Sequence, residues 1–552
     1  MVSIQSKYIL LMVGSNVDKK HLSFFLAFLI DIFKELNPEY FIQKDVGRKR
    51  VYPLEELLGL HFWGDIYGYE SCRQKESLFK ENIESLQILI SGKPKKSKIN
   101  EFKNDYKELI QAFDNFIVEF CLVSGLADAN EFVADGTFLD GYCNDFKALY
   151  PDEIKYIQEF LTKNEKHQKD YELLYSHYLN GNELNDEIQT VIREIRNNIN
   201  VFGLNLILQA LENNQNYQFV MDKLEHMSLN ITKDTVKVSI VDPDAHYMKD
   251  KDNNWGFHYN LQITTDTKNG IIVDHYVTKN PNDKNEIKKI VERLIGKFNH
   301  EGIAVGVDNG YWNIKLLMEI IRNTLVELAI PDKNTARKTK QEIIQKSKSH
   351  KKYGEYIENK NKNKKQRTFI DIMDFEYIEQ KDAYKCPVMN HLLTFQRIVE
   401  NKDGMEYREY STEKCKTCPH LEKCTSQNKR KILIINEPEI QHINKFYQSE
   451  RGQKIKDKRS SYAEGTFAAN IYIRNFRGIK LRGIENVDLE LTPLMIIHNI
   501  LKIFKNMELN VLKKVLKYIK SEKKHRRASM DMLFELQGNF IEKDGKIIDV
   551  LI

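Results

Sequence analysis

Long apolar runs and cysteines are both scarce in this 552-residue chain, and each scarcity limits the classes of protein to which the chain can belong. No apolar run approaches the ~18–20 residues that a membrane-spanning helix needs. The most hydrophobic segment, residues 21–30, is followed at once by Asp31, so we expect a buried helix there and no association with a membrane. The first residues lack the basic start, apolar middle and small-residue cleavage site of a signal peptide, which predicts a cytoplasmic protein.

Only seven cysteines occur, and they are unevenly spaced. Four of them lie within 39 residues: Cys386, Cys415, Cys418 and Cys424. Clustered cysteines in a reducing interior indicate metal binding rather than disulfides, and a C-x2-C pair such as Cys415 and Cys418 presents two thiolates to one tetrahedral Zn²⁺. We therefore predict one structural Zn²⁺ at these four cysteines, with redox-active or incidental cysteines as the alternative. The other three are expected to be ordinary buried thiols: Cys72, Cys121 and Cys143.

Positive charge is concentrated in a few stretches, although the net charge is only +5. Residues 333–367 contain 13 Lys and Arg against 3 acids, residues 513–527 contain 8 against 1, and residues 451–482 contain 9 against 2. Such stretches are either solvated surface or contacts to a phosphate backbone. Under the second interpretation, four residues of the stretch 451–482 are expected to contact DNA: Lys458, Arg459, Arg474 and Arg477.

Helical periodicity dominates the first 127 residues, with a polar connector at 91–103 and an amphipathic helix from about residue 102 to 126. Two helices around a basic connector fit a helix-turn-helix DNA reader and equally a plain helical domain. A charged helical insertion is predicted at 145–230. Strands are predicted at 131–140, 235–244, 258–264, 270–277, 302–308 and 325–331, with helices at 285–298 and 312–322. This order predicts an α/β domain, a mixed sheet with helical crossovers.

The strand at 302–307 ends abruptly on Asp308, which Asn309 and Gly310 follow. An acid at the carboxyl end of a buried strand is costly unless it is paired or binds a metal, and that end of an α/β sheet is where ligands are held. The alternative is an Asx-Gly turn whose aspartate caps the helix from Tyr311 onward.

Several motifs occur in one order: Asp135-Gly136-Thr137, Asp242-Pro243-Asp244-Ala245 with Tyr259-Asn260-Leu261-Gln262, Val307-Asp308-Asn309-Gly310-Tyr311, the four cysteines, and Ala463-Glu464-Gly465-Thr466-Phe467. This order resembles the bacterial insertion-sequence transposases of the DDE class. The group with the greatest resemblance is the eleven-eighty-two-like group, which carries a cysteine insertion ahead of its glutamate. The resemblance covers about residues 46–506.

The resemblance implies a ribonuclease-H-like α/β catalytic core, a mixed sheet flanked by helices. It also implies an N-terminal helical domain, a helical insertion and a small zinc-binding insertion. The catalytic acids would be Asp135, Asp308 and Glu464, which would hold Mg²⁺ or Mn²⁺, with Asp242 in reserve for the first position. The implied domains are 1–128 helical and DNA-binding, 129–147 first core strand, 148–233 helical insertion, 234–335 core sheet, 336–430 basic linker and zinc insertion, 431–506 C-terminal helical part of the core, and 507–552 basic tail.

The implied function is a DNA transposase that cleaves and joins strands at the ends of its insertion sequence by two-metal-ion phosphodiester hydrolysis and transesterification. Its partner would be double-stranded DNA, both terminal inverted repeats and target, and we expect a homodimer when two ends are synapsed and a nucleoid-associated place in the bacterial cytoplasm. Ile471 stands where the family usually has a lysine, which affects one expected DNA contact. The alternatives are a catalytically inactive or domesticated relative that binds DNA sequence-specifically, and a nuclease of the same fold that acts on RNA or branched DNA.

Overall fold

The structure is a computed structural model that divides the chain into two compact units. Unit 1 comprises Met1–Asp128, Asp135–Asn282 and Tyr462–Ile552, and unit 2 comprises Ala129–Ala134 and Asp283–Ser461. The described residues are 22–42, 51–69, 71–81, 92–180, 185–250, 253–298, 302–332, 370, 372–402, 404–467 and 478–506. The predicted basic linker at 333–367 and the basic tail at 507–552 lie outside these ranges.

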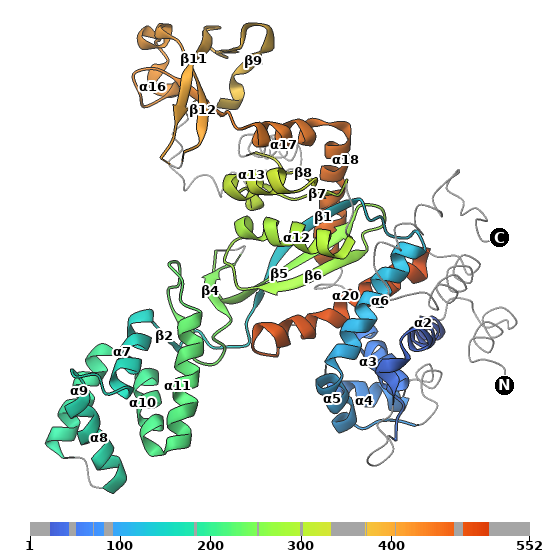
Figure 1. The fold of residues 1–552 in the computed structure, drawn as a ribbon, viewed down its shortest axis with the longest axis vertical. Coiled ribbons are helices and arrows are strands. Elements are labelled where there is room, and N and C mark those ends of the chain that lie inside the picture. The colour runs from blue at the N-terminus through green and yellow to red at the C-terminus, as the bar shows by residue number, and fades with distance from the viewer. Residues whose placement is uncertain are drawn as a thin grey trace, which may run out of the picture. The chain divides into compact units, whose positions relative to one another are not determined.

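Unit 1 begins with helices (Figure 1): α2 (Leu22–Leu36), α3 (Leu54–Ile66), α4 (Cys72–Glu81), α5 (Lys96–Asp105) and α6 (Lys107–Val123). Residues 22–30 of the hydrophobic segment lie in α2, where Leu26 and Leu29 are fully buried, so the predicted core helix is confirmed over these residues. In the part of the chain that the structure describes, no helix has the length and apolarity to cross a membrane.

The helix predicted from about residue 102 to 126 is confirmed over 107–123 as α6, but its predicted start is wrong, because residues 102–105 belong to α5. Tyr106 departs from helical geometry, with φ −118° and ψ 37°, and separates α5 from α6. The predicted polar connector is also wrong in part, because α5 begins at Lys96. Ile99 and Phe102 give α5 a buried face, and its lysines are good helix formers, so polarity alone did not indicate a loop here.

The sheet of unit 1 is built on the predicted hairpin of β5 (Trp255–Asp266) and β6 (Ile272–Thr278). These strands pair antiparallel from Asn260↔Thr278 to Thr265↔Ile272, with a register shift after Thr264. β5 also neighbours β1 (Glu131–Asp140) and β4 (His246–Lys249), and the sheet continues through β3 (Val238–Ser239) to β2 (Ala148–Leu149).

The strand predicted at 235–244 is wrong over most of its length. Only Val238 and Ser239 pair with neighbouring strands, and β4, which follows, was not predicted. The chain turns at Asp242, whose carbonyl accepts the Ala245 N–H at 3.2 Å, so the predicted strand does not continue to residue 244. Pro243 lies inside that turn and has no N–H to offer a strand.

The segment predicted as a helical insertion is helical in the structure, and Figure 1 shows its described helices gathered around one another: α7 (Pro151–Leu161), α8 (Gln168–Asn180), α9 (Asp186–Asn198), α10 (Val201–Glu212) and α11 (Asn214–Leu229). Asparagines cap three of them, because the side chains of Asn185, Asn200 and Asn213 accept N–H groups of the first turn. The helices share an apolar core that includes Ile157 and Leu224.

The long helix α20 (Ile484–Asn506) covers the hairpin of unit 1. The side chain of its Asn499 holds both backbone groups of Ile272, accepting from the N–H at 2.8 Å and donating to the carbonyl at 2.8 Å. Val487, Leu491 and Met495 of α20 pack with Tyr259, Leu261 and Ile263 of β5 in one apolar cluster.

In unit 2, the first residues of β1 pair parallel with β7 (Ala304–Gly306), and β7 pairs parallel with β8 (Glu327–Ala329). The helices α12 (Glu286–Phe298) and α13 (Ile314–Asn323) supply the crossovers, so the predicted β-hairpin–α–β–α–β order is confirmed. The helices α17 (Pro438–Gln448) and α18 (Glu450–Arg459) pack on β8, and α18 also packs on β7.

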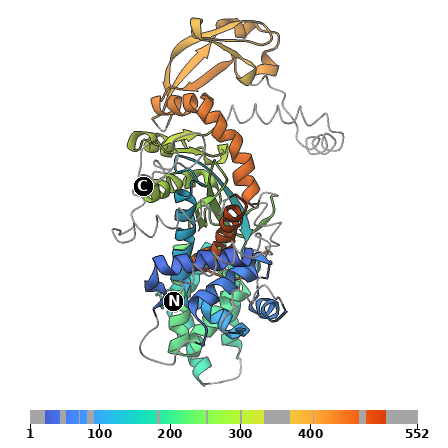
Figure 2. The same ribbon diagram turned by 90° about the vertical axis from the view of Figure 1, so that its right-hand side faces the viewer.

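A second sheet, entirely antiparallel, lies within unit 2 between β8 and α17 in the chain. Its order is β13-β12-β11-β10-β9, from β9 (Glu376–Ile378), β10 (Ala383–Lys385), β11 (Leu392–Glu400), β12 (Glu406–Ser411) and β13 (Lys431–Ile435). Figure 2 shows these orange strands together, with α17 directly after them. The four clustered cysteines all fall between β10 and β13.

Candidate functional site

Asp308 lies two residues after the end of β7 in unit 2 and is half-buried. Its Oδ1 accepts the Gly310 N–H at 2.7 Å, and it caps the short 3₁₀ turn Asn309–Tyr311. A Cβ at residue 310 would lie 2.8 Å from that Oδ1, so glycine leaves room for the carboxylate. The structure therefore contains the turn at Asp308 that was the alternative to a metal-binding role. A carboxylate has about four lone-pair positions, so one hydrogen bond leaves capacity for a cation.

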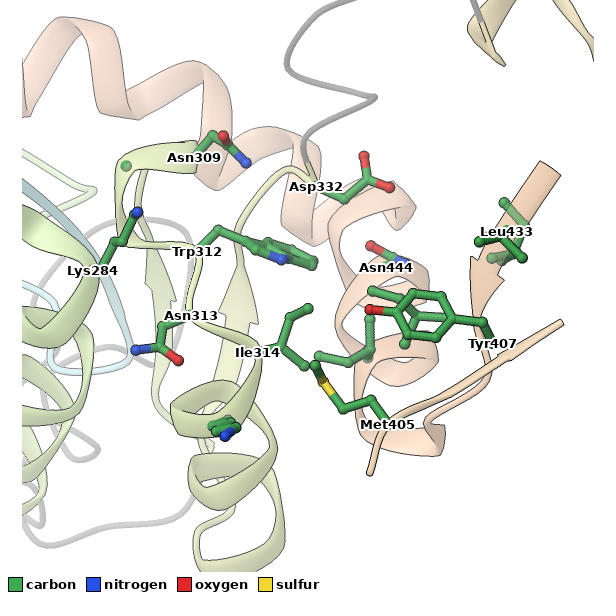
Figure 3. A pocket seen from close by; sticks show the side chains of 15 residues that line it. Lys284, Asn309, Trp312, Asn313, Ile314, Asp332, Met405, Tyr407, Leu433 and Asn444 are labelled. Atoms are coloured by element: carbon green, nitrogen blue, oxygen red, sulfur yellow. The ribbon is translucent and has the colours of Figure 1, made fainter. Parts of the chain in front are cut away.

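The loop after Asp308 forms one wall of a cavity of about 750 Å³. Figure 3 shows its other wall, which comes from α17 and the second sheet, including Asn444, Met405 and Tyr407. Aromatic and aliphatic side chains share the lining with amides, with two lysines, Lys284 and Lys315, and with the carboxylate of Asp332. Such a mixed lining has flat apolar surfaces beside hydrogen-bonding groups and charges of both signs, which suits a polar ligand with a flat apolar part.

Asp135 lies near the middle of β1, in the part of the strand that belongs to unit 1. It is 8% exposed, and its Oδ1 accepts the N–H of Gly136 at 3.0 Å. A carboxylate this deeply buried in a strand is costly without cations or donors around it.

Glu464 ends the π-helical turn Ser460–Glu464 that follows α18, and it belongs to unit 1. Its backbone is described, but its side chain lies outside the description. Tyr462 of the same turn is anchored by its hydroxyl, which donates to the Lys268 carbonyl at 3.0 Å. π-Helical turns are rare and occur frequently at functional sites.

The structure describes two of the four residues that were predicted to contact DNA. Lys458, which is exposed, and Arg459, which is half-buried, lie at the end of α18 in unit 2. Arg474 and Arg477 lie outside the described residues.

Asp242, the reserve for the first acid, is engaged in the packing of unit 1. The Tyr259 hydroxyl donates to Oδ1 at 2.8 Å and lies 2.9 Å from Oδ2, and the Gly483 N–H donates to Oδ1 at 3.0 Å. The residue is 1% exposed, and burial raises the pKa of its carboxyl against these hydrogen bonds. Asp242 thus joins β5 to the segment that leads into α20.

A row of buried polar residues on β5 was missed as a site feature. Asn260, Gln262 and Thr264 are at most 2% exposed and alternate with the apolar residues that pack against α20. Successive side chains point to opposite faces of a strand, so one face of β5 is polar and buried. The Gln262 amide donates to Asn260 Oδ1 at 2.9 Å. Alternation of Tyr-Asn-Leu-Gln-Ile-Thr in the sequence was the available signal.

The four clustered cysteines line one small pocket of about 20 Å³ beneath the second sheet, together with His391, His420 and Arg430. Burial raises the pKa of Cys415 and of Cys424, and nearby cysteines raise each further. Across the ranges that the structure describes, however, no group of three or more His, Cys, Asp or Glu side chains has a metal-holding arrangement. The donors suit zinc chemically and gather at one place, while the ligand geometry is not formed.

The comparisons with known proteins give one match. Residues 385–504 match a family model described as Transposase DDE domain. The match covers about a fifth of the chain and includes the cysteine cluster, α18 and Glu464, but not Asp135 or Asp308. Searches of curated proteins and of solved structures found no match.

The matched segment supports a DDE transposase, for which DNA is the partner and divalent metal ions are the usual cofactors. The mixed α/β architecture fits a core of that type.

Proposed function

We propose that this protein is a DNA transposase that cleaves and joins strands at the ends of its own insertion sequence. The observation that carries the proposal is the match of residues 385–504 to the Transposase DDE domain model, on a segment that contains Glu464. The finer assignment to the eleven-eighty-two-like group rests on the order of the motifs in the sequence.

The proposed catalytic core is ribonuclease-H-like. In its support, β5 pairs with β6 and neighbours β1, β1 pairs parallel with β7, and β7 pairs parallel with β8. A hairpin followed by two parallel strands joined through helices is the connectivity that this fold requires. In this arrangement Asp135 lies within the first core strand and Asp308 follows the fourth.

Asp135, Asp308 and Glu464 are the residues that would hold Mg²⁺ or Mn²⁺. Their chemistry fits, because hard divalent cations prefer carboxylate oxygens. When bound, a pair of such ions supplies a nucleophilic oxygen and stabilises the leaving oxygen of phosphodiester transfer. We assign the first position to Asp135 rather than Asp242, because Tyr259 and Gly483 already hold the Asp242 carboxylate.

The chain's own contribution would be to place the DNA strand. Lys458, Arg459, Arg474 and Arg477 would contact phosphates, which position a strand without reading its sequence. The cavity beside Asp308 would hold a nucleotide next to the cut, with Trp312 on one wall and Tyr407 on the other. Synapsis of two ends would involve a homodimer, and the protein would act on the bacterial nucleoid.

We further propose that Cys386, Cys415, Cys418 and Cys424 hold one structural Zn²⁺. Their shared pocket supports this, because it gathers four thiols, the donor set of a structural tetrahedral Zn²⁺ site, at one place. Zinc would then supply folding free energy to a segment whose apolar core is small.

A second candidate is a catalytically inactive relative that binds the same DNA. The test is strand cleavage by the purified protein on DNA that carries the terminal repeats, with Mg²⁺ or Mn²⁺ present. We expect cleavage at the repeat ends that depends on the metal. Specific binding without cleavage in either metal would favour the inactive relative, and equal cleavage of RNA or branched DNA would favour a different nuclease.

A further inference from the structure

An aromatic surface lies on one face of the β4–β5 hairpin in unit 1. Lys249 is paired with Trp255 and Tyr247 with Phe257 across the two strands, and all four residues share a face. The rings of Tyr247 and Trp255 stack at 5.3 Å with an interplanar angle of 16°, and Phe257 meets Tyr247 at 5.1 Å. Trp255 is 49% exposed, so the outer ring of this stack is accessible to solvent.

Three cations accompany these rings. Lys237 Nζ lies 3.9 Å from the centre of Tyr247, and Lys249 Nζ lies 5.4 Å from the centre of Trp255. Beside them, the Arg482 guanidinium lies 5.1 Å from the ring of Tyr142, which is 54% exposed. The Gly141 N–H donates to the Phe257 carbonyl at 2.8 Å, which ties Tyr142 to the same hairpin.

Among the described residues, two carboxylates beside the hairpin already have partners, and a third, Asp145, adds its charge to burial in raising the pKa of Tyr247. Asp140 lies 2.9 Å from His258 Nδ1. Asp250 accepts both the N–H and the side-chain amide of Asn254, at 2.8 and 3.0 Å. The hairpin therefore combines exposed flat apolar rings with cations, a pairing that suits a ligand with flat bases and regularly spaced negative charges.

We propose that this hairpin surface (Tyr142, Lys237, Tyr247, Lys249, Trp255 and Arg482) binds single-stranded DNA. An unpaired base stacks on Trp255, and the flanking phosphates lie against the lysines and Arg482. Duplex DNA fits less well, because its bases are already stacked on each other and only its phosphates are available. The inference deepens the proposed function, since cutting a strand at an element end produces unpaired nucleotides.

The experiment titrates the full chain with single-stranded oligothymidylate, without added Mg²⁺ or Mn²⁺, and follows tryptophan fluorescence. The chain has three tryptophans, and Trp63 and Trp312 are 2% and 7% exposed. We expect quenching that Trp63→Phe retains in full and Trp255→Phe largely removes, any remainder coming from Trp312 in the cavity beside Asp308. Quenching undiminished in Trp255→Phe overturns the proposal, as does equal quenching by duplex DNA of the same length.

Affinity is measured separately, by anisotropy of a labelled oligonucleotide. Trp255→Leu should weaken binding roughly 5- to 150-fold, the range found for removal of one base stack, and Lys249→Ala should weaken it and reduce its salt dependence. Phe219 and Lys223 on α11 form the matched control, because Phe219 is 53% exposed and Lys223 Nζ lies 5.1 Å from its ring centre. Phe219→Leu and Lys223→Ala should leave affinity unchanged.

The titrations need neither an added divalent cation nor cleavage. They can therefore refute DNA binding by the hairpin surface without refuting the proposed transposase function. A chain that cuts repeat ends while Trp255→Leu binds oligothymidylate as the wild type does would refute the hairpin surface alone. A Trp255→Leu variant that changes only the oligomeric state would identify a contact between protein copies instead and would equally refute it.

Discussion

Ile455 of α18 lies directly against the backbone of Gly306 in β7: a Cβ on residue 306 would be 2.5 Å from Ile455 Cγ2. Asp308 is two residues further on, and Lys458 and Arg459 are on the next turn of α18. Glycine at this position therefore determines how closely the helix that leads to Glu464 packs on the strand that leads to Asp308.

Gly306→Val should separate α18 from β7. Overpacking of a buried site costs about 1–3 kcal/mol, and we expect a lower melting temperature together with reduced cleavage. Gly296→Ala in α12 is the control, because no atom lies within 4 Å of its Cβ position, and it should keep or slightly raise stability. A Gly306→Val variant as stable as wild type would show that the close approach is unimportant.

Asp135→Asn and Asp242→Asn should have opposite effects. Asp242 is held by Tyr259 and Gly483 in a buried site, so its substitution should lower the free energy of unfolding by about 1–3 kcal/mol and leave cleavage measurable at a temperature where the variant is folded. Asp135→Asn should abolish cleavage with little change in melting temperature. Thermal unfolding and a cleavage assay on both variants decide this, and the reverse pattern would move the first catalytic acid to Asp242.

Metal analysis of the purified chain should give about one Zn²⁺ per chain. Cys415→Ser should lose the metal and destabilise the second sheet, since that residue lines the shared pocket. Cys143→Ser is the matched control, because Cys143 lies outside the cluster and burial raises the pKa of its thiol to about 11. A metal-free wild-type chain with this segment fully folded would contradict the zinc assignment.

His275 should make stability depend on pH. Burial opposes its charge, but the hydrogen bond and charge of Asp114, 3.3 Å away, and the charge of Asp488 outweigh burial and raise the pKa of His275. A raised histidine pKa contributes stability that is complete below the unfolded value, about 6.5, and is lost as pH rises through the folded value.

Unfolding midpoints across this pH range test the contribution of His275. The wild type should lose stability as pH rises, and His275→Gln should reduce that dependence. An identical pH profile for the two chains would show that Asp114 and Asp488 do not hold the imidazolium.

Local pattern predicted the β5–β6 hairpin, the helices of the insertion and the alternation of strands and helices around Asp308. Period and turn residues determine these elements without help from distant segments. The same reasoning failed where tertiary contacts decide: Ile99 and Phe102 bury a face of α5 despite its charge, and a turn at Asp242 ends a run that was expected to be a longer strand.

The candidate site was less accessible from sequence. Asp308 could be named because an acid after an apolar strand is unusual, yet its hydrogen bond to Gly310 also fits a plain turn. The buried polar face of β5 was visible as an alternation but carried no meaning until burial distinguished Asn260 and Gln262 from surface amides. The aromatic hairpin was missed because Tyr247 and Trp255 stack only when β4 pairs with β5, and β4 itself was not predicted.

Cleavage of repeat-end DNA by the Asp308→Asn variant tests the central claim most directly. The variant removes one negative charge and keeps an oxygen that can accept the Gly310 N–H, so it should fold as the wild type does. Wild type should cut the DNA in Mg²⁺, and the folded variant should show no detectable product in either Mg²⁺ or Mn²⁺. Cleavage by folded Asp308→Asn at the wild-type rate would contradict the assignment of Asp308 as a catalytic metal ligand.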